Sequence, residues 1–368
     1  MTHASTSIGA IVAVVALGAS AGCGAKTGLL IDDAGRRACS PGEVVLARRA
    51  TRLLLVVDRS GSMAKALDGS EPTPVTPSRW ELLRNAIDTA FGPLDTEVEL
   101  GAKFYPQRLG PEVTDVSPAI GCVITPGLEV EPALGRLGAV VDVFRASAPK
   151  GGTPTAPAIT EGSSYLVAHG RAGLSQAIVL ATDGGPNCNA DPAFDPRTCT
   201  CTSVPVDCSA FPERGIYSCL DERRTVGAVD ASARAGVPVY VIGIDDPTRP
   251  ELSDTLDRLA VAGGRPRTAP GERSFYSVRR PSDLASALDA VRGSIGCAYI
   301  PPPGVRTAES IDLRIGGASV GRDPTHVDGW DLVVDGGDVI AFFGSACERS
   351  SAPGVAVTVR LACPDAGP

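Results

Sequence analysis

Residues 52–62 read RLLLVVDRSGS, an unbroken apolar run that ends abruptly at Asp58. A short apolar run closed by a polar turn predicts a buried strand of a parallel sheet. Residues 177–185, AIVLATDGG, repeat the pattern, because a second apolar run ends just before Asp183. Open α/β sheets bind their ligands outside the carboxyl ends of the strands, so these two aspartates are predicted to lie near each other.

Strand and helix patterns alternate around these two runs. The sequence predicts further strands at 97–105, 237–244 and 274–278, and helices that start at Ser78 and that cover 132–146, 155–169, 221–235, 250–262 and 281–292. The first helix opens with a capping box formed by Ser78 and Glu81. This alternation predicts an α/β fold, a doubly wound, Rossmann-like and mostly parallel sheet with helices on both faces.

A third polar segment, residues 151–155 or GGTPT, adds a hydroxyl group after a Gly-Gly turn. The three segments together offer two carboxylates and three hydroxyls, on Asp58, Ser60, Ser62, Thr153 and Asp183. A hard cation such as Mg²⁺ takes about six oxygen ligands and keeps several waters. We therefore predict a site for Mg²⁺, or for Mn²⁺ or Ca²⁺, with one position open to an outside carboxylate. The same residues also suit plain turns, with Thr153 or Thr155 as the N-cap of the helix that follows.

The order Asp58-x-Ser60-x-Ser62, then Thr153, then Thr182-Asp183-Gly184 resembles the von Willebrand factor type A (VWA) family and its metal-ion-dependent adhesion site (MIDAS). The resemblance covers residues 51–296. It implies that the serines and the threonine supply hydroxyl ligands, while the aspartates bind the ion directly or through water. It also implies a non-enzymatic protein that binds a protein or surface ligand through an acidic side chain of that partner. A disulfide-stabilised envelope structural protein with a non-adhesive metal site is the alternative, and a metal-dependent hydrolase is a third.

The amino-terminal residues predict export. A short apolar stretch at 8–19 is followed by small residues and Cys23, which is typical of a signal peptide with a lipobox-like end at 1–23. Cys23 is then the lipidated residue, and 24–50 form a tether to the first strand. We expect a location in the cell envelope, with contact to the membrane by the lipid anchor alone. The net charge of −8 and the scattered arginines argue against nucleic acid as a partner.

Eleven cysteines are an odd number, and lipidation of one leaves ten. In an exported chain these ten are expected to form five disulfides. They are Cys39, Cys122, Cys188, Cys199, Cys201, Cys208, Cys219, Cys297, Cys347 and Cys363. A zinc site within the cluster Cys188, Cys199, Cys201, Cys208 and Cys219 is the competing interpretation.

Two segments stand apart from the α/β pattern. Residues 184–220 form a cysteine-rich insertion directly after Asp183. It is either a disulfide-stabilised surface loop without a role in binding or a wall of the ligand-binding surface. Residues 297–368 contain short alternating runs, which predict a small all-β module in which Cys347 and Cys363 are close enough in sequence to be bridged.

The sequence offers little for catalysis. Its three histidines are His3, His169 and His326, and none stands beside a candidate nucleophile. His169 ends a predicted helix, where the helix dipole stabilises a positively charged side chain. No phosphate-binding loop or dinucleotide fingerprint is present in the sequence. We therefore expect no enzymatic activity.

Overall fold

The computed structural model of this 368-residue chain describes residues 29–31, 37–39, 43–113, 116–170, 174–189, 194–202, 208–210, 215–246, 248–267, 270–295, 297–303, 311–325, 327–334, 338–352 and 354–361. The predicted signal peptide with Cys23 lies outside these residues. Among the described residues, no helix has the length and apolar character needed to cross a membrane.

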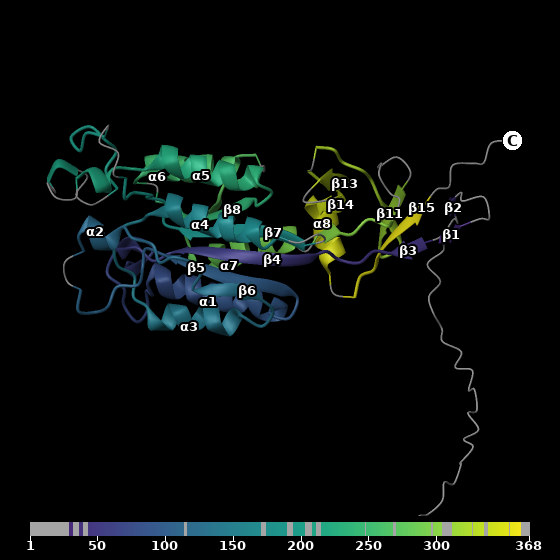
Figure 1. The fold of residues 1–368 in the computed structure, drawn as a ribbon, viewed down its shortest axis with the longest axis horizontal. Coiled ribbons are helices and arrows are strands. Elements are labelled where there is room, and N and C mark those ends of the chain that lie inside the picture. Colours follow the sequence, from purple (N-terminus) through teal and green to yellow (C-terminus); the bar gives the residue numbers. More distant parts are fainter. Residues whose placement is uncertain are drawn as a thin grey trace, which may run out of the picture.

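A six-stranded sheet forms the centre of the larger part of the molecule (Figure 1). Its order is β6-β5-β4-β7-β8-β9, and only β6 runs antiparallel to its neighbour. The bounds are β4 (Ala50–Asp58), β5 (Val98–Tyr105), β6 (Val130–Ala133), β7 (Leu174–Thr182), β8 (Val239–Ile244) and β9 (Tyr276–Val278). The chain adds strands outward from β4 on one side and then, from β7, on the other. The strand order therefore reverses between β4 and β7, where ligands of such sheets bind.

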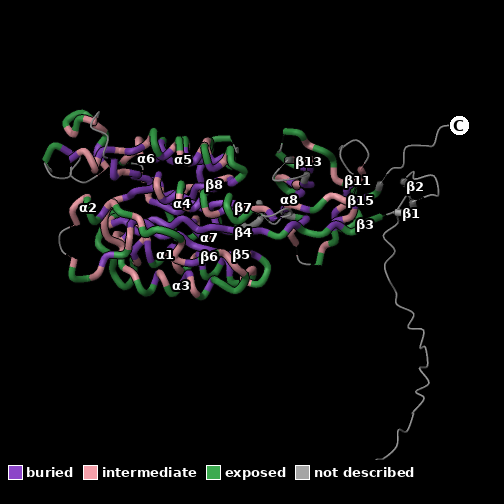
Figure 2. The backbone as a smooth tube through the Cα atoms, in the orientation of Figure 1, coloured by how far each residue is buried: buried purple, intermediate pink, exposed green. Residues whose placement is uncertain are grey.

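Helices cover both faces of this sheet (Figure 1). One face carries α1 (Arg79–Phe91), α3 (Leu137–Ala146) and α7 (Pro281–Ile295), and the other carries α4 (Thr155–Ala168), α5 (Glu222–Arg234) and α6 (Pro250–Ala262). Leu53 and Leu55 point into the first core, while Leu54 points into the second. Because alternate residues of β4 face opposite cores, residues 53–57 are apolar without a break, and every residue of the strand after Ala50 is buried (Figure 2).

The start of α1 agrees with the sequence. The hydroxyl of Ser78 accepts the Glu81 backbone N–H at 3.2 Å, and the Glu81 carboxylate accepts the Ser78 N–H at 3.0 Å. These two bonds form the predicted capping box.

The predicted helix over 132–146 is wrong in its first part. Residues Val130–Ala133 form the edge strand β6, and α3 begins only at Leu137. Pro132 cannot donate to a sheet ladder, which suits an edge strand. Gly135 then takes a φ of +71°, a left-handed turn that ends the strand before the helix.

A second, smaller part of the molecule adjoins the end of the sheet where β4 begins (Figure 1). It contains a three-stranded sheet, β10-β14-β13, and a four-stranded sheet, β12-β11-β15-β3. The bounds are β3 (Glu43–Val45), β10 (Ala298–Tyr299), β11 (Ile311–Ile315), β12 (Ala318–Val320), β13 (Gly329–Val334), β14 (Asp338–Phe343) and β15 (Val357–Leu361). A further antiparallel pair joins β1 (Leu29–Ile31) to β2 (Arg37–Cys39).

This module differs from the expected all-β unit in two ways. It includes a helix, α8 (Gly344–Ser351), whose first turn is fixed because the Asp328 carboxylate accepts the Ala346 N–H at 3.0 Å. It also includes β3, which belongs to the predicted tether and pairs with β15. The short valine pair of β3 covers the edge of β15, which would otherwise expose an unpaired strand.

The described residues contain four disulfides. They are Cys122–Cys188, Cys199–Cys219, Cys201–Cys208 and Cys297–Cys347. The suggested bridge between Cys347 and Cys363 is therefore wrong, because pairing of β10 with β14 places Cys297 beside α8. Cys363 and the side chain of Cys39 lie outside the described residues. The zinc interpretation is also wrong, since all five cysteines of that cluster form disulfides and offer no thiolate.

Candidate metal-binding site

Asp58 is the last residue of β4 and is fully buried. One carboxylate oxygen accepts the Ser60 backbone N–H at 2.8 Å, and the other accepts the Thr182 hydroxyl at 2.7 Å. Burial raises the pKa of Asp58 to about 7, with a further contribution from the negative charge of Asp183, although these hydrogen bonds oppose the shift. Both bonds come from neutral groups, so they leave the carboxylate charge without compensation.

The two serines lie directly beyond Asp58. Ser60 is the N-cap of a short 3₁₀ helix, η1 (Gly61–Ala64), and its hydroxyl lies 3.0 Å from that of Ser62. Adjacent ligands of an octahedral Mg²⁺ ion, each at about 2.1 Å from the metal, are separated by about 3.0 Å. The two hydroxyls thus have the spacing of two neighbouring ligands of one ion.

The loop that carries Thr153 is joined to the serine loop by backbone hydrogen bonds. The Gly61 N–H donates to the Gly151 carbonyl at 3.0 Å, and the Lys150 N–H donates to the Arg59 carbonyl at 2.8 Å. Thr153 is buried beside this junction. The alternative role of Thr153 or Thr155 as a helix cap is wrong, because α4 has Pro154 at its N-cap and no side chain caps it.

The two glycines before Thr153 are required by close packing. Gly151 has a φ of +101°. A Cβ atom on Gly152 would lie 2.5 Å from the sulfur of Cys188 and 3.2 Å from that of Cys122. The backbone therefore passes against the Cys122–Cys188 disulfide at a distance that only glycine allows.

Asp183 follows the last residue of β7 and makes an ion pair that the sequence did not predict. Its carboxylate accepts a hydrogen bond from Arg79 Nη1 at 2.7 Å, and the two side chains are 6% and 10% exposed. Thr182 connects this turn to Asp58, since its hydroxyl donates to Asp58 and accepts the Gly184 N–H at 3.2 Å. One feature of the sequence could have pointed to Arg79. It is a cation in the first turn of a helix, where the helix dipole disfavours positive charge and a compensating partner is expected.

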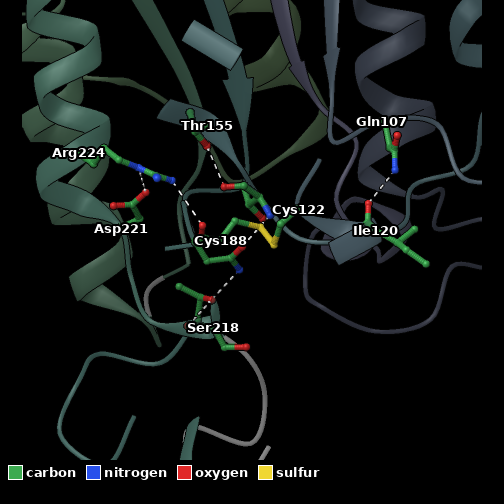
Figure 3. The surroundings of a disulfide bond; sticks show 11 residues. Gln107, Ile120, Cys122, Thr155, Cys188, Ser218, Asp221 and Arg224 are labelled. Carbon is green, nitrogen blue, oxygen red and sulfur yellow. Dashed lines mark hydrogen bonds and ion pairs between the residues drawn. A yellow bond between two sulfur atoms is a disulfide. The ribbon is translucent and has the colours of Figure 1, made fainter. Parts of the chain in front are cut away.

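The cysteine-rich insertion begins against this site. Asn187 exchanges two hydrogen bonds with Thr153, because its side-chain oxygen accepts the Thr153 N–H at 2.7 Å and its own N–H donates to the Thr153 carbonyl at 3.0 Å. The neighbouring Cys188 is bonded to Cys122 (Figure 3). Within the described part of 184–220, the first residues therefore form one wall of the Thr153 loop.

Both partners of this disulfide are fixed by further contacts (Figure 3). Arg224 of α5 donates to the Asp221 carboxylate at 2.7 Å and to the Cys188 carbonyl at 3.4 Å. On the other side, the Gln107 amide donates to the Ile120 carbonyl at 3.0 Å, two residues before Cys122. The disulfide thus ties the insertion, α5 and the loop after β5 into one support for the site.

The five predicted residues are accordingly gathered at the carboxyl ends of β4 and β7. Asp58, Ser60 and Ser62 are linked by direct contacts, Thr153 is joined to them through its loop, and Asp183 is close enough to perturb Asp58. Their donor set consists only of hard oxygen atoms, which suits a divalent cation such as Mg²⁺.

No family model matches this sequence, and no curated protein does. Among solved structures, the chain is similar to the pilus adhesin SpaC from Lactobacillus rhamnosus GG in its open conformation, with 16% identity, coverage of 87% of this chain and 40% of that chain, and a TM-score of 0.45. It is also similar to the PilB minor pilin from Streptococcus sanguinis, with 14% identity, 68% and 62% coverage, and a TM-score of 0.45.

A third similar structure is the vWF domain of the type V pili tip protein Mfa5 from Porphyromonas gingivalis, with 14% identity, 68% and 96% coverage, and a TM-score of 0.43. The chain spans only 40% of the length of the pilus adhesin SpaC. With TM-scores below 0.5, these similarities leave the function to be argued from the site itself.

Proposed function

We propose that this protein is a non-enzymatic, metal-dependent binding protein of the cell envelope, built on a doubly wound VWA domain. The observation that carries this proposal is the Ser60–Ser62 hydroxyl pair, 3.0 Å apart, beside the buried and uncompensated carboxylate of Asp58. A divalent cation at this position would neutralise that carboxylate and satisfy both hydroxyls.

The chain's own residues define what the ion would do. Ser60, Ser62 and Thr153 would supply hydroxyl ligands, while Asp58 and Asp183 would act directly or through water. The bound ion supplies a positive charge with a coordination position open to an outside oxygen. Asn187 and the Cys122–Cys188 disulfide would hold the Thr153 loop in place beside the ion.

The arrangement favours binding over hydrolysis. His169 follows the far end of the 14-residue helix α4, about 20 Å along the helix axis from Thr155, and there it stacks on Tyr165. It therefore supplies no general base to the site. Hydroxyl ligands without a positioned base poorly equip a metal site to activate water.

The partner we propose is a protein or surface ligand that presents an acidic side chain, and not a nucleic acid. Export through the leader and anchoring by a lipid on Cys23 would place the protein at the cell envelope. A purely structural envelope role is the second candidate, favoured by the four disulfides, three of which involve the insertion.

Calorimetric titration with Mg²⁺ and Mn²⁺ tests the site. We expect about one ion per chain for the wild type and none for a variant with Ser60→Ala and Ser62→Ala. Ser286→Ala, an exposed serine on α7, is the matched control and should bind as the wild type does. Equal binding heat in the double variant would overturn the assignment.

Capture of envelope proteins on the immobilised chain, with Mg²⁺ and with chelator, separates the two roles. The adhesive role predicts that a partner is retained only with the ion and not by the double variant. Retention that is the same in chelator would favour the structural role.

A further inference from the structure

Arg79 provides the candidate metal site with a positive charge of its own. Its guanidinium donates to Asp183 Oδ2 at 2.7 Å, to the Ala66 carbonyl at 3.1 Å and to the Leu67 carbonyl at 3.4 Å. These contacts hold the group between the start of α1, the segment after η1 and the end of β7. Its side chain is 10% exposed, so the charge is largely removed from water.

This placement is unfavourable without a compensating contact. Arg79 is the first residue of α1, where the helix dipole repels a cation, and burial of the guanidinium adds a desolvation cost. Its charge is balanced by the ion pair with Asp183, a residue assigned above to the metal site. The residue is thus positioned to influence that site.

The charges decide what this influence is. Asp58 and Asp183 together carry −2 when both are ionised, and Arg79 reduces the sum to −1. A divalent cation added to that set leaves +1 instead of 0. The ion is therefore held less tightly than two aspartates alone would hold it, and the completed site keeps a positive charge toward solvent.

We propose that Arg79 is a resident cation of the metal site, which lowers its affinity for the divalent ion and leaves a positive charge for an acidic group of the partner. This inference rests on the proposed metal-dependent function. Arg79 donates to Oδ2 of Asp183, so the ion pair is compatible with a second role for the other carboxylate oxygen toward the ion. Arg79 acts by its charge, and its ion pair with Asp183 holds that charge beside the site.

Mn²⁺ titration of the full chain tests the proposal through binding alone. Arg79→Gln removes the charge and should bind Mn²⁺ about tenfold or more tightly than the wild type. Arg79→Lys keeps the charge and should stay within about threefold of the wild type. Arg145→Gln breaks an exposed ion pair on α3, with 63% and 73% exposed side chains, and should leave affinity unchanged.

Arg79→Met is a second neutral variant, which keeps the test valid if Arg79→Gln does not fold. The stem of Arg79 lines an apolar pocket with Met63, Leu67 and Leu82, where a methionine side chain can pack. It should tighten Mn²⁺ binding as Arg79→Gln does, with circular dichroism spectra like those of the wild type.

A second measurement follows the completed site. With Mn²⁺ bound, acetate is the simplest carboxylate probe, and the neutral variants should bind it several-fold more weakly than the wild type. If the wild type binds Mn²⁺ and the neutral variants bind it no more tightly, the role of Arg79 is overturned. The metal site itself would still stand. A wild type and variants that all fail to bind would overturn the metal site as well.

Discussion

Asp58 links the candidate site to the pH dependence of folding. Its pKa rises from 3.8 to about 7 on folding, because burial and the charge of Asp183 disfavour the carboxylate. The metal-free fold therefore binds this proton more tightly than the unfolded chain. The resulting stabilisation is complete below pH 3.8 and is lost as pH rises through about 7.

We accordingly expect the contribution of Asp58 to lower the melting temperature of the metal-free protein as the pH rises from 5 to 8. Mg²⁺ should reverse this fall, because the ion favours the carboxylate form. The difference between melting temperatures in Mg²⁺ and in chelator should therefore grow with pH. Asp58→Asn has no proton to release here, and a slope in this variant as steep as that of the wild type would contradict the assignment.

Gly152 offers a test of the packing behind Thr153. A Cβ atom there would lie 2.5 Å from Cys188 Sγ, so Gly152→Ala must displace the loop or the disulfide. We expect a loss of about 1–3 kcal/mol in the free energy of unfolding and weaker Mn²⁺ binding. Gly138→Ala in α3 meets no atom within 4 Å and should stabilise by up to about 1 kcal/mol. Denaturant titration measures both effects.

For single residues, the sequence predicted the hydroxyl and carboxylate side chains of the candidate site better than the side chains that contact them. Asp58 and Ser60 were recognisable because spacing along a strand end fixes where they lie. Arg79 was not, since its ion-pair partner Asp183 is 104 residues away and nothing local marks the contact.

Among the elements around the site, the Cys122–Cys188 disulfide packs against the loop that carries Thr153. It joins the loop after β5 to the insertion across 66 residues, whereas Cys201–Cys208 spans only 7. In the chain-entropy description, loops of these lengths contribute about 4 and about 2 kcal/mol.

Replacing Cys122 and Cys188 by serine should lower the melting temperature more than the same change at Cys201 and Cys208. Only the first change is expected to weaken Mn²⁺ binding as well, because the sulfurs of Cys122 and Cys188 lie against Gly152. Calorimetry on the two variants measures both effects. Equal loss of ion affinity in both would mean that the insertion supports the site as a whole.

The elements that the sequence predicted well have a strong periodic signal of their own. α6 occupies Pro250–Ala262 as expected, because proline opens it and two glycines follow it. The sequence pattern places the second half of β6 at the start of a predicted helix, since four residues that contain a proline carry no strand signal. α8 was missed because its eight residues lie among strands.

At the scale of the whole molecule, the C-terminal module is assembled from both ends of the described chain. Val45 pairs with Thr358 in its sheet, and Leu46 is buried in its core. A three-residue strand with a partner more than three hundred residues away has no local pattern, so the sequence indicated a tether there. The predicted boundary near residue 50 therefore divides a unit that the fold keeps together.

The position of β4 has a mechanical consequence. The strand connects the module directly to Asp58 at the candidate site, a span of about 30 Å over its nine residues. If the amino-terminal side is the anchored one, a partner pulling on the site loads β4 along its own axis. Its ladders to β5 and β7, with eight paired positions each, then resist in shear and share the force among all their hydrogen bonds. With the anchor at that end, the attachment point and the candidate site would lie at opposite ends of the central strand, an arrangement suited to resist tension.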